Sequence, residues 1–206
     1  MPVQHNPAPT TSPVHDLIRN RWSPRAFDPR PIEAEKLRSL FEAARWAASS
    51  FNAQPWFFIV GTRDDLKTYQ MILDSFVEFN QGWATGAPVL ALSVARLSFP
   101  NGEKPNRHAF HDVGQASANL AIEATALGLM VHQMAGIDPE KARKNFGIPE
   151  GYEAVAGIAI GYPGPAESLP EPLRTREIAP RERKPLESFV FGRKWGEPSR
   201  VLSAKS

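Results

Sequence analysis

Three hydrogen-bond donors stand at alternate positions near the amino terminus: Arg21, Ser23 and Arg25. Pro24 favours an extended backbone at the residue before it, so the three side chains can point toward one ligand. Arginine suits a phosphate group because its planar guanidinium is always charged and donates two parallel hydrogen bonds. A solvated basic turn has the same composition, so this segment by itself indicates only a candidate anion site.

A second candidate site is the polar turn at residues 49–54. Ser49, Ser50 and Asn52 carry side-chain oxygens that compete with the hydrogen bonds of a helix, and Pro55 prevents a return to helix. The turn follows a helix predicted over residues 33–48 and precedes an apolar run, 56–61, typical of a fully buried strand. Loops between rigid elements commonly carry binding groups, so this turn is a candidate for ligand contact.

Motifs of several other enzyme classes are absent from the sequence. It contains no G-x-S-x-G, no G-x-x-x-x-G-K-[ST] and no G-x-G-x-x-G after a predicted strand. It contains no cysteine, which excludes disulfides, thiolate nucleophiles and cysteine-ligated zinc or iron–sulfur clusters. His108 and His111 stand one helical turn apart, but no further histidine or cysteine lies nearby to complete a metal site. His132 suits either a gating role or a buried structural one.

Hydrophobic periodicity predicts the elements that position these residues. We expect helices over residues 14–20, 33–48, 110–128 and 138–147, and one more that begins at Asp64 or Asp65. We expect strands over residues 56–61, 88–95, 129–136 and 153–162. Ser12 is the expected N-cap of the first helix, with Pro13 at its first position. Strands that alternate with helices indicate an α/β or α+β chain.

Three further segments have less regular patterns. Residues 80–83 break the helical pattern, residues 96–107 read as a polar loop that suits a lid or a plain surface loop, and residues 163–185 read as a Pro- and charge-rich connector. The long helix over residues 110–128 has small residues on several sides, which favours a central helix at a dimer contact.

The composition predicts one globular domain. The chain has 206 residues, of which 42% are hydrophobic and 22% charged, with a net charge of +2. This charge gives no basis for nucleic-acid binding, and no apolar run is long enough to span a membrane. The first residues lack the features of a signal peptide, so the cytoplasm is the expected location. We expect a flexible tail at residues 1–11 and a single domain at 12–206, with an extended C-terminal arm from about residue 163.

The order and spacing of four segments resemble the nitroreductase family of FMN enzymes. These are R-x-S-x-R-x-F at residues 21–27, S-x-x-N-x-Q-P-W at 49–56, Gly161-Tyr162-Pro163, and Arg193-Lys194-Trp195-Gly196. The resemblance covers residues 14–196, nearly the whole chain. Each segment is a weak signal alone, whereas their combination is specific.

The resemblance implies a fold and an activity. The fold is α+β in three layers, with a central, mostly antiparallel sheet flanked by helices, in an intertwined homodimer. The activity is FMN-dependent oxidation of NADH or NADPH, followed by reduction of a nitroaromatic, a quinone or a similar flat acceptor in a ping-pong sequence of hydride transfers through flavin N5. The flavin performs the chemistry in such enzymes, so no catalytic side chain and no metal are expected.

The resemblance also implies roles for individual residues. Arg21 would hold the FMN phosphate from one side, and Arg193 with Lys194 from the other. Ser23 would meet the phosphate–ribityl region, and Arg25 the N1/O2 edge, where positive charge stabilises reduced flavin. The turn at residues 49–54 would reach the cofactor from the partner subunit, and the backbone at residues 133–136 would face N5. The full set of expected cofactor-binding residues is Arg21, Trp22, Ser23, Arg25, Ser49, Ser50, Asn52, Asn80, Gln133, Met134, Ala135, Gly136, Arg193 and Lys194.

Two alternatives remain open from the sequence. One keeps FMN but changes the reaction, as in dehalogenase-like or flavin-modifying enzymes of the same fold. The other is a non-enzymatic flavin-binding protein. The chain departs from many relatives at Ala135 and Gln133, where an acidic residue and a proline are common, and at Ala48, where a proline is common. The departures at Ala135 and Gln133 bear on substrate preference, and the departure at Ala48 bears on the contact assigned to Ser49. The sequence leaves the acceptor and the choice between NADH and NADPH open.

Overall fold

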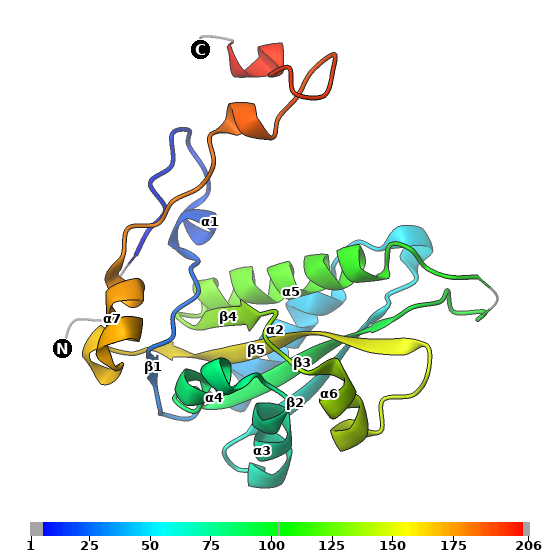
Figure 1. The fold of residues 1–206 in the computed structure, drawn as a ribbon, viewed down its shortest axis with the longest axis vertical. Helices are drawn as coiled ribbons and strands as arrows, with labels where there is room; N and C mark the ends of the chain where they lie inside the picture. The colour runs from blue at the N-terminus through cyan, green and yellow to red at the C-terminus, as the bar shows by residue number, and fades with distance from the viewer. Residues whose placement is uncertain (1–5, 103, 204–206) are drawn as a thin grey trace.

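The computed structural model describes residues 6–102 and 104–203. Its centre is an antiparallel sheet of β1 (Phe27–Asp28), β2 (Trp56–Thr62), β3 (Val89–Arg96), β4 (Met130–Met134) and β5 (Tyr152–Pro163). The strands are ordered β1-β5-β3-β2, and β4 pairs with β5 as well. The longest strand, β5, therefore joins β1, β3 and β4 into one sheet (Figure 1).

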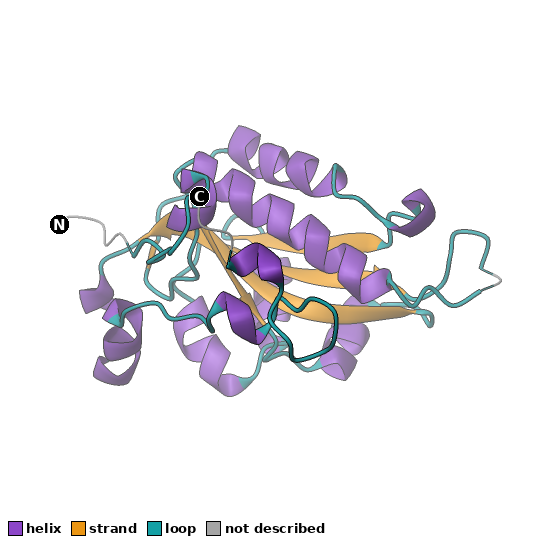
Figure 2. Ribbon diagram, turned by 90° about the horizontal axis from the view of Figure 1, so that it is seen from above, coloured by secondary structure: helices purple, strands orange, loops and turns teal. Residues whose placement is uncertain are grey.

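Helices cover both faces of this sheet, as Figure 2 shows. On one face, α2 (Ala34–Arg45) and α5 (Ala109–Ala126) share an apolar cluster with Val89 and Ala91 of β3. On the other, α3 (Leu66–Asp74), α4 (Glu78–Ala84) and α6 (Pro139–Phe146) share a cluster with Leu90 and Leu92. Alternate residues of β3 thus point into different cores, as the two-residue period of a strand requires. The three-layer α+β fold expected from the sequence is confirmed.

Two short helices lie before the first strand and after the last strand. α1 (Asp16–Asn20) precedes β1, and α7 (Glu171–Ile178) follows β5. After α7, the chain leaves the body of the protein as an arm that includes the 3₁₀ turns Leu186–Ser188 and Arg200–Leu202 (Figure 1). Among the described residues, no helix is long and apolar enough to cross a bilayer.

The residues before α1 lie along the segment that follows α7. Asn6 Nδ2 donates to Ala179 O at 3.2 Å, and Arg181 Nη1 donates to Asn6 O at 2.9 Å. Residues 1–5 of the expected flexible tail, and residues 204–206 of the expected arm, are outside the described part of the chain.

Several predicted elements are confirmed, including the starts of two helices. Asp65 accepts the Thr68 N–H as the N-cap of α3, and Asp138 accepts the Lys141 N–H as the N-cap of α6. The first helix cap was predicted wrongly. His15, not Ser12, is the N-cap of α1, because its extended backbone lets Nδ1 accept the Leu17 N–H, and Pro13 therefore lies outside the helix.

Other predictions need correction. The helix expected to reach residue 48 ends at Arg45, and residues 80–83, interpreted as a break, lie within α4 (Glu78–Ala84). Burial of Trp83 at 3% exposure outweighs the low helix propensity of Gly82. The strand expected to be fully buried, β2, is the edge strand beside β3, and its Phe57 is 44% exposed. The connector at 163–185 contains α7, a helix that was not predicted from the sequence.

Candidate functional site

The segment between α1 and β1 forms one wall of a pocket of about 210 Å³. Residues after the middle of α7 form the opposite wall. Five arginines and one carboxylate line this arginine pocket: Arg21, Arg25, Arg176, Arg181, Arg183 and Glu177. Trp22 and Ser23 also border it, and Trp22 is nearly buried. The fold therefore brings Arg21, Ser23 and Arg25 to one place, as the alternate spacing predicted.

The cations of the arginine pocket repel one another. Burial lowers the pKa of Arg21, and the positive charge of Arg183 lowers that pKa further. The pKa of Arg181 is lowered in the same way, first by burial and then by Arg21 and Arg183. An anion in the pocket relieves this repulsion, so the arrangement favours a negatively charged ligand.

Glu177 is the carboxylate of the pocket and is 2% exposed. Its oxygens accept the backbone N–H of Arg25 at 2.9 and 3.0 Å and that of Ala26 at 3.0 Å. Burial raises the pKa of Glu177, while these backbone hydrogen bonds oppose the rise. The carboxylate is thus engaged by the backbone, and its structural effect is to hold the segment that carries the three donors.

A cluster of buried rings lies beside Arg25. The Trp83 and His132 ring centroids are 4.5 Å apart, and the Arg25 guanidinium lies 5.9 Å from the centroid of Trp83. His132 Nδ1 lies 2.9 Å from Pro24 O, and since a carbonyl only accepts, Nδ1 carries the proton. Burial lowers the pKa of His132 to about 4, so the ring is neutral at pH 7 with its lone pair on Nε2.

Asn80 joins this cluster to the end of β4. Its Nδ2 donates to Gly136 O at 3.0 Å, and its Oδ1 accepts from Trp83 Nε1 at 3.2 Å. A Cβ added at Gly136 would lie 2.4 Å from Asn80 Nδ2, so only glycine fits there without a shift. Met134 is buried, whereas Gln133 and Ala135 are exposed. The predicted residues Asn80 and Gly136 are therefore in direct contact.

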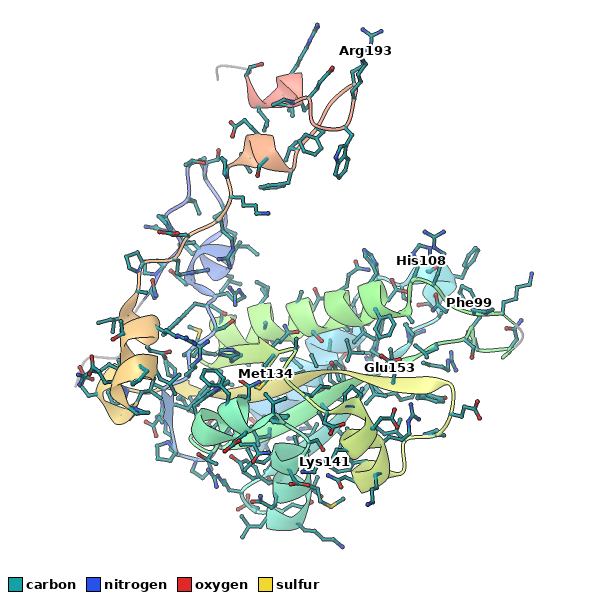
Figure 3. All side chains as sticks on the ribbon, viewed as in Figure 1. Phe99, His108, Met134, Lys141, Glu153 and Arg193 are labelled. Atoms are coloured by element: carbon teal, nitrogen blue, oxygen red, sulfur yellow. The ribbon has the colours of Figure 1, made fainter. Side chains whose placement is uncertain are left out.

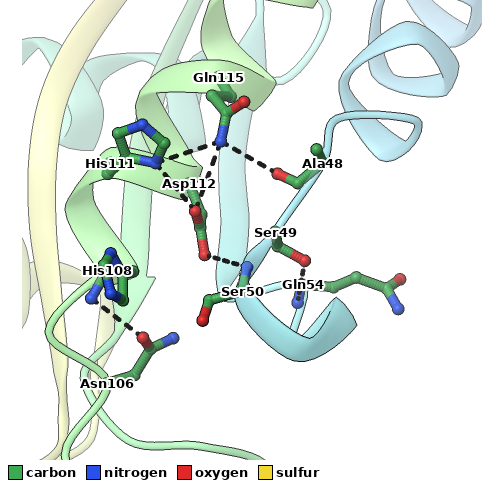
Figure 4. Close-up of polar contacts among 9 residues, drawn as sticks. All are labelled: Ala48, Ser49, Ser50, Gln54, Asn106, His108, His111, Asp112 and Gln115. Carbon is green, nitrogen blue, oxygen red and sulfur yellow. Dashed lines mark hydrogen bonds and ion pairs between the residues drawn. The ribbon is translucent and has the colours of Figure 1, made fainter.

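The polar turn at residues 49–54 lies outside the arginine pocket, beside the first turns of α5 (Figure 4). The Ser50 N–H donates to the buried Asp112 carboxylate at 3.0 Å, and the Gln54 N–H donates to Ser49 Oγ at 3.0 Å. Gln115 Nε2 donates to Ala48 O at 3.3 Å. The turn is thus built as a defined structure, and Asn52 lies exposed within it.

The Nitroreductase family model matches residues 18–78 and 67–162. The chain belongs to the nitroreductase family. It is 30% identical to the Major NAD(P)H-flavin oxidoreductase of Aliivibrio fischeri, over 86% of this chain and 96% of that protein. It is also 41% identical over 96 residues to an uncharacterized 15.4 kDa protein of Mycolicibacterium smegmatis, over 47% of this chain and 65% of that protein.

A solved structure described as an oxidoreductase containing FMN is similar over almost the whole nitroreductase chain. Its sequence identity is 35% and its TM-score 0.87, over 93% of this chain and 98% of that one. The α+β fold and the family suggested by the sequence motifs are therefore both confirmed.

The predicted cations Arg193 and Lys194 lie on the arm, away from the arginine pocket of this nitroreductase chain. Figure 3 shows Arg193 far from Met134, at the outer part of the arm. Both residues are exposed, and Lys194 Nζ lies 3.9 Å from a Glu197 oxygen. Within one chain, neither residue joins Arg21.

Three arginines of the pocket were not predicted from the sequence: Arg176, Arg181 and Arg183. Arg181 and Arg183 belong to the run Pro180-Arg181-Glu182-Arg183-Lys184, which was interpreted only as part of a charged connector. Arg181 and Arg183 stand at alternate positions beside a proline, as Arg21, Ser23 and Arg25 do, and that similarity was the available signal.

The histidines considered for a metal have other neighbours. His111 Nδ1 lies 3.1 Å from Asp112 Oδ1, and the His108 and His111 ring centroids are 6.5 Å apart. Within the described residues, no group of three or more histidine, aspartate or glutamate side chains is arranged to hold a metal ion.

Proposed function

We propose that this nitroreductase-family protein is an FMN-dependent oxidoreductase that uses NADH or NADPH to reduce nitroaromatics, quinones or similar flat acceptors. Membership of the family supports the proposal, as do the names of a 30% identical NAD(P)H-flavin oxidoreductase and a 35% identical FMN-containing oxidoreductase. The observation that carries it is the arginine pocket, whose excess of cations suits the phosphate that distinguishes FMN from riboflavin.

The residues present fit FMN. Arg21, Arg181 and Arg183 repel one another, and a phosphate dianion placed among them would turn that repulsion into attraction. Arg25 Nε is buried and has no hydrogen-bond partner among the described residues, so it has a donor to offer to a ligand. In this proposal Arg21, Arg181 and Arg183 hold the phosphate, Ser23 meets the ribityl chain, and Arg25 approaches the N1/O2 edge of the ring.

When bound, FMN would supply the redox chemistry that connects oxidation of NAD(P)H to reduction of the acceptor, by ping-pong hydride transfer through flavin N5. The side chains of the protein bind and orient the reactants. Arg25 contributes a fixed positive charge at the edge where negative charge develops on reduction. Neutral His132 adds no charge beside Arg25, and its hydrogen bond to Pro24 O keeps the donor segment in place.

The site is completed by a second chain in this proposal. None of Ser49, Ser50 and Asn52 lines the arginine pocket, so we assign these residues to the cofactor of the partner subunit. We likewise assign Arg193 and Lys194 to the pocket of a second chain. Exposed apolar side chains on the arm, such as Trp195 at 92% exposure, favour burial against a partner. A cavity of about 640 Å³ between residues 8–14 and 181–189 also favours contact with a partner.

A comparison of FMN with riboflavin tests the role assigned to the arginine pocket. The two ligands differ only in the phosphate, so the protein should bind FMN more tightly by about 100-fold or more, as two charge-assisted hydrogen bonds would give. Arg21→Ala should reduce this ratio by at least tenfold, because it removes one of the cations. Arg38→Ala is the matched control, since Arg38 is an exposed arginine of α2 that does not line the pocket.

Equal affinities for FMN and riboflavin would contradict the assignment of the pocket to the phosphate. Tight FMN binding without reduction by either nucleotide would instead favour a dehalogenase-like or flavin-modifying enzyme, or a non-enzymatic flavin-binding protein.

A further inference from the structure

Two aromatic rings meet on the surface beside the turn at residues 49–54. The Phe51 side chain is 93% exposed, and its ring centroid lies 5.9 Å from that of Phe99, with the planes at 80°. The rings border a cavity of about 420 Å³ whose other lining residues are Pro100, Asn101 and Lys104. Figure 3 shows Phe99 on the loop that extends beyond β3. The pair therefore presents aromatic surface to solvent at one edge of the protein.

The backbone that presents Phe51 is strained. Phe51, Asn52 and Gln54 have φ angles of 50°, 52° and 46°, and they are the non-glycine residues with positive φ in the described chain. Side chains with a Cβ seldom adopt this region, and bulky residues adopt it least. Such strain persists only where the surroundings impose it, and it is concentrated at functional sites.

Three side chains impose this conformation from outside the turn. Asp112, only 2% exposed, accepts the Ser50 N–H, and Gln115 donates to Ala48 O (Figure 4). On the other side, Arg96 Nη2 donates to Ala53 O at 3.3 Å. The turn is therefore fixed at both ends to α5 and β3, and the Phe51 ring is displayed by a rigid support.

We propose that Phe51 and Phe99 form the binding surface for the flat electron acceptor, and that Lys104 favours acceptors with an anionic substituent such as a carboxylate. This inference rests on the proposed function, because Phe51 lies between Ser50 and Asn52, which are assigned to the cofactor of the partner subunit. Two rings at nearly right angles offer a face and an edge to a planar aromatic guest. The Lys104 ammonium on its flexible stem adds a positive charge at the rim of the same cavity.

The test uses 4-nitrobenzoate and nitrobenzene, two flat compounds that differ in the carboxylate. Equilibrium binding of each to the full-length oxidised protein needs no turnover. Phe51→Ala and Phe99→Ala should each weaken the binding of both compounds by about 2- to 10-fold, the range of one aromatic contact. Lys104→Met should weaken only 4-nitrobenzoate, by about 2- to 5-fold, the range of an exposed ion pair. Leu66→Ala removes an exposed apolar side chain of α3 that is 64% exposed and should change neither affinity.

Phe51→Asn distinguishes the effect of losing the ring from the effect of changing the backbone conformation, because asparagine tolerates positive φ better than alanine. Loss of binding in both Phe51 variants supports the ring contact, and loss in Phe51→Ala alone overturns it. Unchanged affinity in Phe51→Ala and Phe99→Ala, or no binding to the unaltered protein, also overturns it.

Failure of the proposed function has a different signature. In that case the protein takes up no FMN, or its FMN is not reduced by NADH or NADPH, whether or not 4-nitrobenzoate and nitrobenzene bind. In a protein that does turn over, the ratio of kcat/KM for 4-nitrobenzoate to that for ferricyanide, which is not a flat aromatic, should fall in both phenylalanine variants.

Discussion

The carboxylate of Glu177 accepts the backbone N–H of Arg25 at 2.9 Å, across 152 positions of the chain. The bond joins α7 to the segment that carries Arg21, Ser23 and Arg25, and the same carboxylate accepts the Ala26 N–H. One buried side chain therefore holds together the two walls of the arginine pocket.

Glu177→Ala should destabilise the protein by about 2–4 kcal/mol, because it leaves two largely buried N–H groups without an acceptor. Glu177→Gln should cost less, since its amide oxygen still accepts. Chemical denaturation measures both changes. Glu171, an exposed carboxylate at the start of α7 that pairs with Arg174, provides the control, and Glu171→Ala should stay within about 0.5 kcal/mol. Equal effects of the two alanine substitutions would show that Glu177 does not hold the segment.

Arg183→Ala should weaken FMN binding by about 1.5–3 kcal/mol, the range for a hydrogen bond to a charged group. The reason is that Arg183 lines the same pocket as Arg21 and lowers its pKa. Fluorescence titration of the apoprotein with FMN measures the change.

Arg193→Ala should lower the affinity for FMN only where the arm of a second chain reaches the pocket. An unchanged affinity in Arg193→Ala together with Lys194→Ala would remove both residues from the site, and an unchanged affinity in Arg183→Ala would contradict the pocket itself.

The neutral state of His132 predicts a pH dependence of stability. The folded-state pKa of about 4 lies below the ordinary value of 6.5. The unfolded chain therefore binds a proton at His132 more readily than the folded protein does. The contribution of neutral His132 to the free energy of unfolding is complete above pH 6.5 and is lost as the pH falls toward 4. The full shift of the His132 pKa corresponds to about 3 kcal/mol of unfolding free energy. Denaturation between pH 7 and 4 should show this slope, and His132→Gln should flatten it. The same slope in both proteins would show that other groups cause it.

The arm predicts a homodimer. Trp195, Val201 and Phe189 are 92%, 70% and 57% exposed, so the described part of one chain leaves these apolar side chains in solvent. Sedimentation of the full-length protein should show a dimer at micromolar concentration. Trp195→Ala combined with Phe189→Ala should shift it toward the monomer, whereas Leu66→Ala on α3 should leave it unchanged. A monomer at all concentrations would contradict both the dimer and the assignment of residues 49–52 to a partner's cofactor.

Local signals predicted much of the fold. The caps at Asp65 and Asp138 were predictable because aspartate side chains accept N–H groups two or three residues onward. The strands at residues 88–95 and 153–162 were predictable from their length and apolar character. By contrast, α4 depends on burial of Trp83 and on contact between Asn80 and Gly136, which are distant in sequence. No local pattern contains that information.

The candidate site was predictable only in part, for the same reason. The spacing of Arg21, Ser23 and Arg25 indicated an anion site, and the fold gathers them. The other wall of the pocket comes from residues after α7, and it reaches Arg21 only because Glu177 ties α7 back to the amino-terminal segment. Arg193 and Lys194 were assigned by motif, and within one chain the arm carries both away from that pocket.

The visible absorbance spectrum of the purified full-length protein, recorded before and after anaerobic addition of NADH and then NADPH, tests the central proposal most directly. We predict flavin absorbance bands that bleach on addition of at least one nucleotide and return when a nitroaromatic or quinone is added. A protein that remains colourless after incubation with FMN would contradict the cofactor assignment and the function built on it.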